Sequence, residues 1–599
     1  MISIILFSFF FFNYFSEKFK WHKNINEIVL SRISLSLILG VNTVGLLSLI
    51  LICLKLSNFP ILILAILSNT LLCLKFKNFK IFETISKYLK DTESYLRKIY
   101  ENKGKFVSFL ILCFLLLLSI GPINHPDASK YYVGYIYKFW ISNTHLIDGG
   151  LHQGLLSLID FANISFFQEK SVWLIRSLHA LPFLMIYVLF NLRKTSTIIS
   201  IILFTSPVII QWITIGKGMF LGESCLALTF LIWIKNKNTE AFIYLISLIL
   251  LTISIKISSL ITIFPIFIYL IIYFFRNKFK ESFLIIFKKG TITIVYSLII
   301  LAITIIYKYH VTGNIIYPLF NNLIIPDDLQ LSEFWGYLSS YKKNFFNISN
   351  IFIPIDPREY GISLGLVTGI LLLFIPIQNI VQKKFNAKKE YIIGAIQILL
   401  LLFFSQGRGD YYTIPLILIL SDLRFNIKTL NLKSKKFFFI NKYKNIFFKS
   451  ILNIQIFSFL FIGIFSIYQS FYTFFSYEDG MKNFANQYNL VNIVNNETQY
   501  PAFSENIYTN LFFLKKDYIH SDLYNKCLFN ENQKNKNIEL KYKICSKKYN
   551  VKEVVTTNNL IGKSELFDCS KYNYISGARN PLKRKNKYFF ICRLVDKEK

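Results

Sequence analysis

The sequence is poor in acidic residues and in the motifs of common soluble enzymes. It has 34 Asp and Glu against 67 Lys and Arg in 599 residues, giving a formal net charge of +33. There is no Walker motif, no G-x-G-x-x-G after a predicted strand and no nucleophile elbow, so ATP-driven transport, dinucleotide chemistry and serine hydrolysis lack a site. No zinc-finger or RNP-like motif accompanies the positive charge, which argues against nucleic acid as a partner.

Apolar residues dominate what is present. The chain is 53% hydrophobic and 17% aromatic, with a mean hydropathy of +0.44. This composition predicts an all-α polytopic membrane protein, whose basic clusters face anionic membrane lipids between apolar spans. We expect about fourteen spans of a length that crosses the bilayer. They fall near residues 2–15, 33–55, 58–76, 105–122, 171–191, 196–212, 219–234, 240–254, 257–275, 291–308, 361–380, 391–405, 411–422 and 450–474.

Three regions follow from this pattern. Residues 1–104 hold extra N-terminal spans and a basic cytoplasmic loop, because clustered lysines mark the inner side. Residues 105–475 form the transmembrane core, with large outer loops at 123–170 and 309–360. Residues 476–599 form a small extracytoplasmic α/β domain. Within it, the runs NLVNIV, KEVVTT and KYFFICRLV read as strands.

Four of the eight cysteines lie in this C-terminal region. An even number of cysteines outside the cytoplasm predicts two disulfides, and the spacing does not suit a zinc ribbon. Connectivity is left open by the sequence. The residues are Cys527, Cys545, Cys569 and Cys592.

The first large outer loop carries an isolated acid. Asp127 directly follows an apolar segment, and a carboxylate at the edge of the hydrocarbon is commonly kept for chemistry, binding or an ion path. The alternative is that Asp127 caps a helix beginning at Ala128. Lys217 and Lys256 lie in short outward turns where few lysines are expected, and they are either snorkelling side chains or ligands of an anion.

Several segments, in order, carry a resemblance to known proteins. DASKYYVGYIYKFW, DGGLHQGLLSLIDFANIS, IKISSL and TGNIIYPLFN each follow a predicted span. Together they resemble a family of bacterial multi-pass membrane proteins that is similar to the GT-C superfamily of glycosyltransferases. The family has an outer Asp-Ala-x-x-Tyr-His motif, whereas this chain has Tyr132 in the place of the His. GT-C enzymes commonly pair two acids in this loop, but here Ala128 and Ser129 follow Asp127.

The resemblance implies transfer of a sugar from a polyprenyl-phosphate donor to a cell-envelope acceptor at the outer face of the inner membrane. Asp127 would be the general base, because a carboxylate within hydrogen-bond reach removes the acceptor proton. Arg408, in SQGRGDYY, would hold the phosphate, unless it pairs with Asp410. The other substrate-binding candidates are His125, Lys217, Lys256 and Tyr131.

No cofactor or metal is expected, since the histidines have no metal-ligand spacing. A second hypothesis is a non-enzymatic flippase or transporter of lipid-linked glycans, or an envelope glycan assembly partner. A flippase should carry charged residues in the middle of its spans, whereas the sequence places its charges at span ends. A structural or receptor role of the C-terminal domain is a third.

Overall fold

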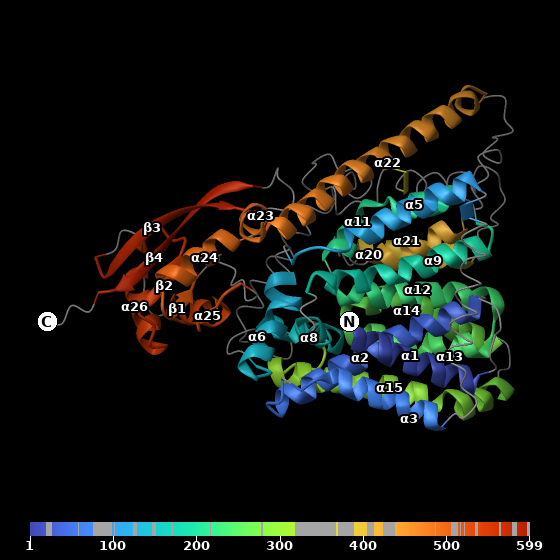
Figure 1. Ribbon diagram of the computed structural model, residues 1–599, viewed down its shortest axis with the longest axis horizontal. Helices are drawn as coiled ribbons and strands as arrows, with labels where there is room; N and C mark the ends of the chain where they lie inside the picture. Colours follow the sequence, from blue (N-terminus) through green and yellow to red (C-terminus); the bar gives the residue numbers. More distant parts are fainter. Residues whose placement is uncertain are drawn as a thin grey trace.

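The computed structural model describes residues 1–317, 367–368 and 389–595, with internal gaps. The gaps are residues 20–26, 58, 76–98, 101, 124–127, 147–150, 169–171, 196, 216, 277–279, 404–411, 423–437, 486, 505–512, 516, 520, 533–536, 562–564 and 578–583. The described chain is mostly helical with a small C-terminal sheet, as predicted (Figure 1).

The first half of the bundle runs from the N-terminus to the end of α9. Its elements are α1 (Ile2–Lys18), α2 (Glu27–Cys53), α3 (Ile61–Lys75), α5 (Lys103–Leu118), η1 (Ala128–Tyr132), α6 (Gly134–Ser142), η2 (Leu151–Leu155), α7 (Leu158–Phe161), α8 (Ile164–Gln168), η3 (Val172–Ala180) and α9 (Leu181–Leu192).

The second half continues with further long helices. They are α10 (Thr197–Phe204), α11 (Pro207–Ile215), α12 (Gly218–Asn236), α13 (Thr239–Ile255), η4 (Ile257–Ser259), α14 (Leu260–Arg276), α15 (Lys280–Thr312), α20 (Lys389–Phe403), α21 (Thr413–Asp422) and α22 (Phe438–Phe475). The long helices lie roughly side by side, with α6 and α8 at the end of the bundle nearest the C-terminal domain (Figure 1). We call this the domain end.

Six helices among the described residues are long and apolar enough to cross a membrane, or seven if a bent pair is one span. The six are Glu27–Cys53, Val172–Leu192, Gly218–Asn236, Ile257–Phe275, Gly290–Thr312 and Lys449–Phe475. This supports a membrane protein, while fourteen spans and the orientation of the chain stay predictions. The predicted span near 361–380 lies almost wholly outside the described residues.

The bent pair, α10 and α11, turns by 54° at Thr205 and Ser206. Pro207 begins α11 and has no N–H, so it cannot continue the hydrogen bonds of α10. Gln455 of α22 fills the break, where its Nε2 donates to the Ile202 carbonyl at 3.2 Å and to Thr205 Oγ1 at 3.0 Å. An amide from a neighbouring helix thus satisfies polar groups that the bend releases.

The C-terminal domain has two layers of helix around a four-stranded sheet. It contains α23 (Tyr477–Phe484), α24 (Tyr488–Glu497), β1 (Pro501–Phe503), α25 (Ser521–Asn532), α26 (Ile538–Lys548), β2 (Glu553–Thr556), β3 (Phe567–Ser576) and β4 (Lys585–Leu594). The strand order is β1-β2-β4-β3, with β1 parallel to β2 and the other neighbours antiparallel. Residues of α24 enter one apolar cluster, and residues of α25 and α26 enter another.

Two of the three predicted strand runs are strands and one is not. KEVVTT contains β2, and KYFFICRLV lies mostly in β4. The assignment of NLVNIV was wrong, because it lies in α24. Its buried residues Leu490, Val491 and Val494 are spaced at i, i+1 and i+4, which puts them on one face of a helix.

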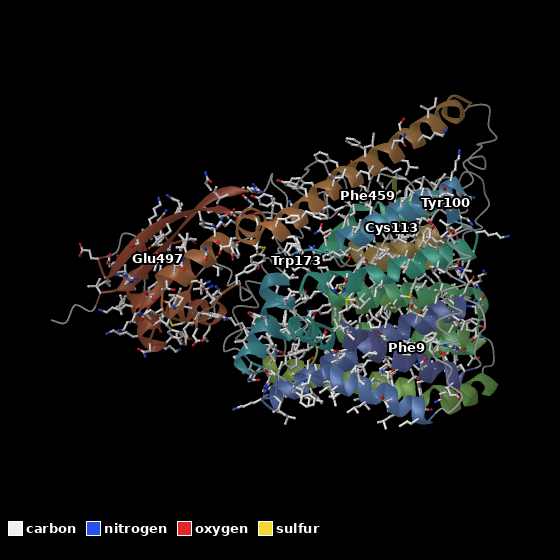
Figure 2. All side chains as sticks on the ribbon, in the orientation of Figure 1. Phe9, Tyr100, Cys113, Trp173, Phe459 and Glu497 are labelled. Carbon is white, nitrogen blue, oxygen red and sulfur yellow. A yellow bond between two sulfur atoms is a disulfide. The ribbon has the colours of Figure 1, made fainter. Side chains whose placement is uncertain are left out.

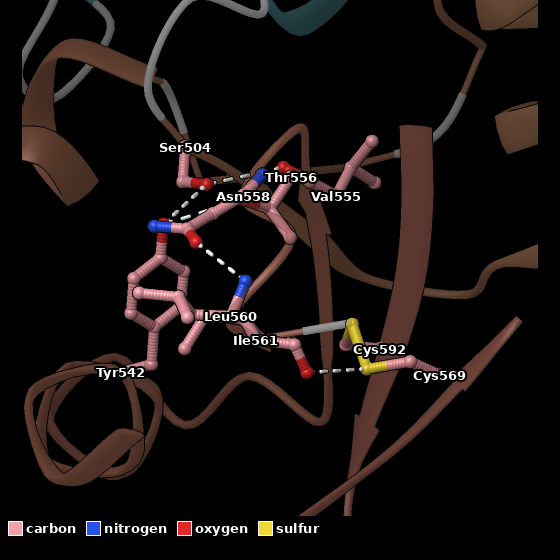
Figure 3. Close-up of a disulfide and its surroundings, with 9 residues drawn as sticks. All are labelled: Ser504, Tyr542, Val555, Thr556, Asn558, Leu560, Ile561, Cys569 and Cys592. Carbon is pink, nitrogen blue, oxygen red and sulfur yellow. Dashed lines mark hydrogen bonds between the residues drawn. A yellow bond between two sulfur atoms is a disulfide. The ribbon is translucent and has the colours of Figure 1, made fainter. Parts of the chain in front are cut away.

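The four C-terminal cysteines form the disulfides Cys527–Cys545 and Cys569–Cys592. The first joins α25 to α26, and the second joins β3 to β4 (Figure 3). They close loops of 18 and 23 residues, for which loss of chain entropy gives about 3 kcal/mol of stabilisation each. The Cys569 sulfur also lies 3.2 Å from the carbonyl of Ile561.

Contacts with the rest of the bundle are made by the end of α22, which leads into the C-terminal domain, and by the domain itself. Trp173 of η3 lies at the junction (Figure 2) and meets Phe474 of α22 edge to face, with 5.8 Å between ring centroids. Ser470 Oγ donates to the Ile120 carbonyl at 3.3 Å. Lys138 of α6 lies 5.7 Å from the ring centroid of Tyr518. The end of α22 is therefore held against η3 and the end of α5, while the domain itself contacts α6.

Candidate functional site

The predicted site residues fall into two groups. Asp127, His125 and Arg408 lie outside the described residues. Tyr131, Lys217 and Lys256 are described, and all three lie at the domain end of the bundle. The structure brings further charged side chains to this end from α7, η3, α12 and α15. We call the set of Asp160, Arg176, Lys217, Glu223, Lys256 and Lys308 the charged layer.

Arg176 is a buried residue of η3, in the middle of an apolar run. Its Nη1 donates to the Thr214 carbonyl at 2.9 Å, near the end of α11. The other side of the guanidinium meets Gly121, where a Cβ would come within 2.1 Å of Nη2. Gly121 has φ +155 and its N–H donates to the Trp173 carbonyl at 3.2 Å. Arg176 thus lies directly against the start of the first outer loop.

His179 is also buried in η3, one turn after Arg176. With three residues per turn, positions i and i+3 of a 3₁₀-helix lie on the same side, about 6 Å apart along the axis. The His179 Nδ1 atom is buried and has no hydrogen-bond partner among the described residues. One side of η3 therefore presents a guanidinium and an imidazole together.

Lys217 occupies the turn between α11 and α12. Its Nζ lies 4.7 Å from the ring centroid of Trp212 and 5.6 Å from that of Tyr132. Tyr132 ends η1, a π-helical turn in which the N–H of Val133 donates to the Ala128 carbonyl at 2.9 Å. Such turns are frequent at functional sites. The segment that immediately follows Asp127 in the sequence is thus packed against a buried ammonium group.

Asp160 of α7 is fully buried and tied to its own helix start. Its Oδ2 accepts hydrogen bonds from the N–H and the Oγ of Ser157, both at 2.9 Å. Burial raises the pKa of the Asp160 carboxyl to about 7, against the lowering effects of the Ser157 hydrogen bonds and the Lys308 charge. Gly218 passes close by, since a Cβ there would stand 3.6 Å from Asp160 Oδ1.

Lys308 of α15 faces the same acid. Its Nζ donates to the Gly154 carbonyl at 2.9 Å, which fastens η2 to α15. Lys308 interacts electrostatically with Asp160 and with Lys256. The neighbouring Tyr307 is buried, and its hydroxyl has no hydrogen-bond partner among the described residues. The first outer loop and α15 therefore meet through buried charges.

Glu223 lies one and a half turns inside α12 and is completely buried. Its Oε1 accepts a hydrogen bond from Ser259 Oγ of η4 at 3.1 Å. Lys256 precedes η4 by one residue, as its N-cap. A carboxylate within a candidate span is costly in hydrocarbon and is by default a marker of function. The expectation that charges keep to span ends fails at this residue.

The charged layer contains more cations than acids. Arg176, Lys217, Lys256 and Lys308 oppose Asp160 and Glu223, so four positive charges less two negative ones leave +2. Charges interact more strongly away from bulk water, where the effective dielectric constant is low. The arrangement suits an anion that reaches the domain end of the bundle, and a phosphate group has the charge and the oxygen acceptors for it.

Two histidines lie close together in the described chain. His145 and His310 stack with 5.6 Å between ring centroids, yet no group of three or more His, Cys, Asp or Glu among the described residues is placed to hold a metal ion. The histidine pair instead links the segment after α6 to the last turn of α15.

Sequence reasoning found part of this site. Lys217 and Lys256 stood out because they interrupt short turns. Arg176, Asp160, Glu223 and Lys308 were not predicted as site residues. Their signal was a single charged residue within an apolar run, as in VWLIRSLHALPF and MFLGESCLAL.

No family model, curated protein or solved structure matches this chain. The resemblance to GT-C enzymes stays a prediction from the motifs quoted above.

Proposed function

We propose that the protein is a membrane glycosyltransferase that moves a sugar from a polyprenyl-phosphate donor to a cell-envelope acceptor at the outer face of the inner membrane. The observation that carries the proposal is the charged layer, whose excess positive charge lies at one end of membrane-type helices. A lipid-linked phosphate is the natural anion for such a position, because its tail is soluble only in the bilayer.

Arg176 and Lys217 are the proposed phosphate ligands. A guanidinium binds phosphate oxygens through two parallel hydrogen bonds, and an ammonium adds a point charge. Arg176 already contacts the loop that leads to Asp127, and Lys217 contacts Tyr132 at the far end of the same segment. Arg408, His125, Lys256 and Tyr131 remain further proposed ligands.

Asp127 is the proposed general base. The acceptor oxygen attacks the anomeric carbon, the bond from that carbon to the phosphate oxygen breaks, and the acceptor proton passes to the Asp127 carboxylate. The leaving phosphate keeps the electron pair of the broken bond, and the cations stabilise its charge. No metal is needed in this scheme, since the cations occupy that role.

The proposal is tested with purified full-length protein, a synthetic polyprenyl-phosphate sugar and a crude envelope acceptor fraction. Asp127→Asn should abolish transfer with unchanged donor binding. Arg176→Gln should weaken donor binding at least tenfold, and Arg176→Lys should recover part of it. Arg593→Gln, at the surface of the C-terminal domain, is the matched control. Full transfer activity in both Asp127→Asn and Arg176→Gln would rule the proposal out.

A lipid-linked glycan flippase is the second candidate, and the bend between α10 and α11 is the observation that favours it. Broken helices within a bundle line the substrate path of many transporters. Here Gln455 occupies the break and satisfies its polar groups, which favours a structural bend. Reconstituted vesicles distinguish the two functions: a flippase moves a labelled lipid-linked glycan across the bilayer without an acceptor, whereas a transferase needs one.

A further inference from the structure

The last span ends in exposed aromatic side chains. Phe471, Phe474 and Phe475 of α22 are 61%, 69% and 79% exposed, and Tyr477 follows at the start of α23. Aromatic residues gather where hydrocarbon meets the lipid headgroups. The end of α22 therefore has the composition of a segment at a membrane surface.

The turn end of the β3–β4 hairpin is fastened to the end of α23, which begins directly after α22, and to the first turn of α24, which contains Asn489. Asn489 Nδ2 donates to the Ile575 carbonyl at 2.9 Å. Gly577 packs so tightly that a Cβ would come within 2.4 Å of the Ala485 carbonyl oxygen. The Arg584 guanidinium lies 5.1 Å from the ring centroid of Phe484. Since α23 has 8 residues and is about 12 Å long, the hairpin lies within one short helix of the membrane exit.

Basic and apolar side chains are combined at this place. We define the hairpin end as Ile575, Arg584, Lys585, Lys587 and Tyr588. Lys585 and Lys587 are exposed, and so are Ile575 at 55% and Tyr588 at 38%. Lys585 and Lys587 project from one face of the hairpin, and Ile575 and Tyr588 project from the other, because side chains alternate along paired strands. A basic face opposite an apolar face is the pattern of a segment that lies in the interface of a membrane with anionic lipids.

The acids nearby do not cancel this charge. Glu478 and Asp479 of α23 lie 3.9 and 3.8 Å from Lys482 Nζ, so part of their charge is neutralised within α23. Arg584, Lys585, Lys587 and Lys482 give +4, and the two acids give −2, which leaves +2 for the described side chains of this surface.

We propose that the hairpin end binds anionic phospholipid headgroups next to α22, and so holds the C-terminal domain on the membrane surface. The occupant follows from charge complementarity and from continuity with the exposed aromatic end of the last span. The proposal does not depend on the glycosyltransferase hypothesis.

The test places a photo-crosslinking amino acid, p-benzoylphenylalanine, at position 575 of the full-length protein in nanodiscs of phosphatidylcholine and phosphatidylglycerol at 7:3. The ratio of the two lipids among the captured adducts is read by mass spectrometry. We expect the ratio of phosphatidylglycerol to phosphatidylcholine among the adducts to be at least about fivefold higher than the bulk ratio, since each nearby cation contributes about a fivefold factor. The combined variant Arg584→Gln, Lys585→Gln and Lys587→Gln should bring the ratio back to the bulk value.

Two controls make the result specific. The same amino acid at Leu560, an equally apolar and 60% exposed site of the same domain, should capture little lipid. Neutralising Lys547, Lys548 and Lys552, which lie away from the hairpin end, should leave the enrichment intact. Three outcomes would overturn the proposal. They are capture of lipid at the bulk ratio while Arg584, Lys585 and Lys587 are intact, no capture at position 575, and preferential capture of an added anionic oligosaccharide. Intact disulfides, read from the mass under non-reducing conditions, verify that each variant has folded.

Discussion

The buried acid Asp160 should make the protein less stable as pH rises. Its pKa in the folded protein is about 7, compared with an ordinary value of 3.8, because burial disfavours the charged form. An acid with a raised pKa binds its proton more tightly in the folded state than in the unfolded state. Its contribution is therefore most favourable below about pH 4, declines as pH rises towards 7, and is constant above that.

The size of the effect follows from the two pKa values. The difference between about 7 and 3.8 corresponds to roughly 4 kcal/mol of stability lost between pH 4 and pH 7. Asp160→Asn removes this loss, because an amide oxygen still accepts the Ser157 hydrogen bonds but carries no charge. The variant should match the wild type near pH 4 and exceed it in melting temperature by several degrees at pH 8.

The assay is thermal unfolding in detergent, followed by tryptophan fluorescence between pH 4 and pH 8. The informative quantity is the difference between variant and wild type, since titration of all other groups cancels. Lys308→Met should move the midpoint of the wild-type decline to higher pH, because a stabilising positive charge is lost. Asp568→Asn, at an exposed acid of β3, should change nothing. A difference that is constant across the pH range would refute the reasoning.

Three more predictions concern packing and covalent links. Gln455→Leu should destabilise the bundle by about 1–3 kcal/mol, because polar groups at the bend lose their partner. In the same unfolding assay, Gln455→Glu keeps the shape of the side chain and an acceptor oxygen, so it isolates the effect of losing the amide donor. Replacing Cys527 and Cys545 with Ala should lower the stability of the C-terminal domain by about 3 kcal/mol, seen as faster proteolysis of the tail under non-reducing conditions. Gly463→Leu should disturb the contact between α22 and α5, where a Cβ would stand 2.2 Å from Phe114, and should lower the melting temperature of the full chain.

Composition and charge spacing were sufficient for the broad architecture. Apolar runs and basic clusters predict membrane helices, and β-branched, aromatic runs predict strands β2 and β4. NLVNIV failed as a strand because Leu490, Val491 and Val494 fit a helical face equally well. Whether the helical period or the strand period applies depends on packing partners from elsewhere in the chain. A local sequence pattern does not contain that information.

The same limit applies to the candidate site. Lys217 stood out because it breaks the charge pattern of a short turn. Arg176 and Glu223 did not, since a single charge within a span carries no information about the neighbours it meets. That Arg176 contacts Gly121, 55 positions earlier, is a property of the tertiary fold.

The winding of η3 sets the positions of Arg176 and His179 relative to each other. Nine residues is long for a 3₁₀-helix, and η3 runs directly into α9. If the α-helical winding of α9 extended backwards to Arg176, the three steps from Arg176 to His179 would cover about 300° in place of 360°. The imidazole would rotate by roughly 60° away from the guanidinium and approach it by about 1.5 Å along the axis. Both groups point into one space only while this segment stays overwound.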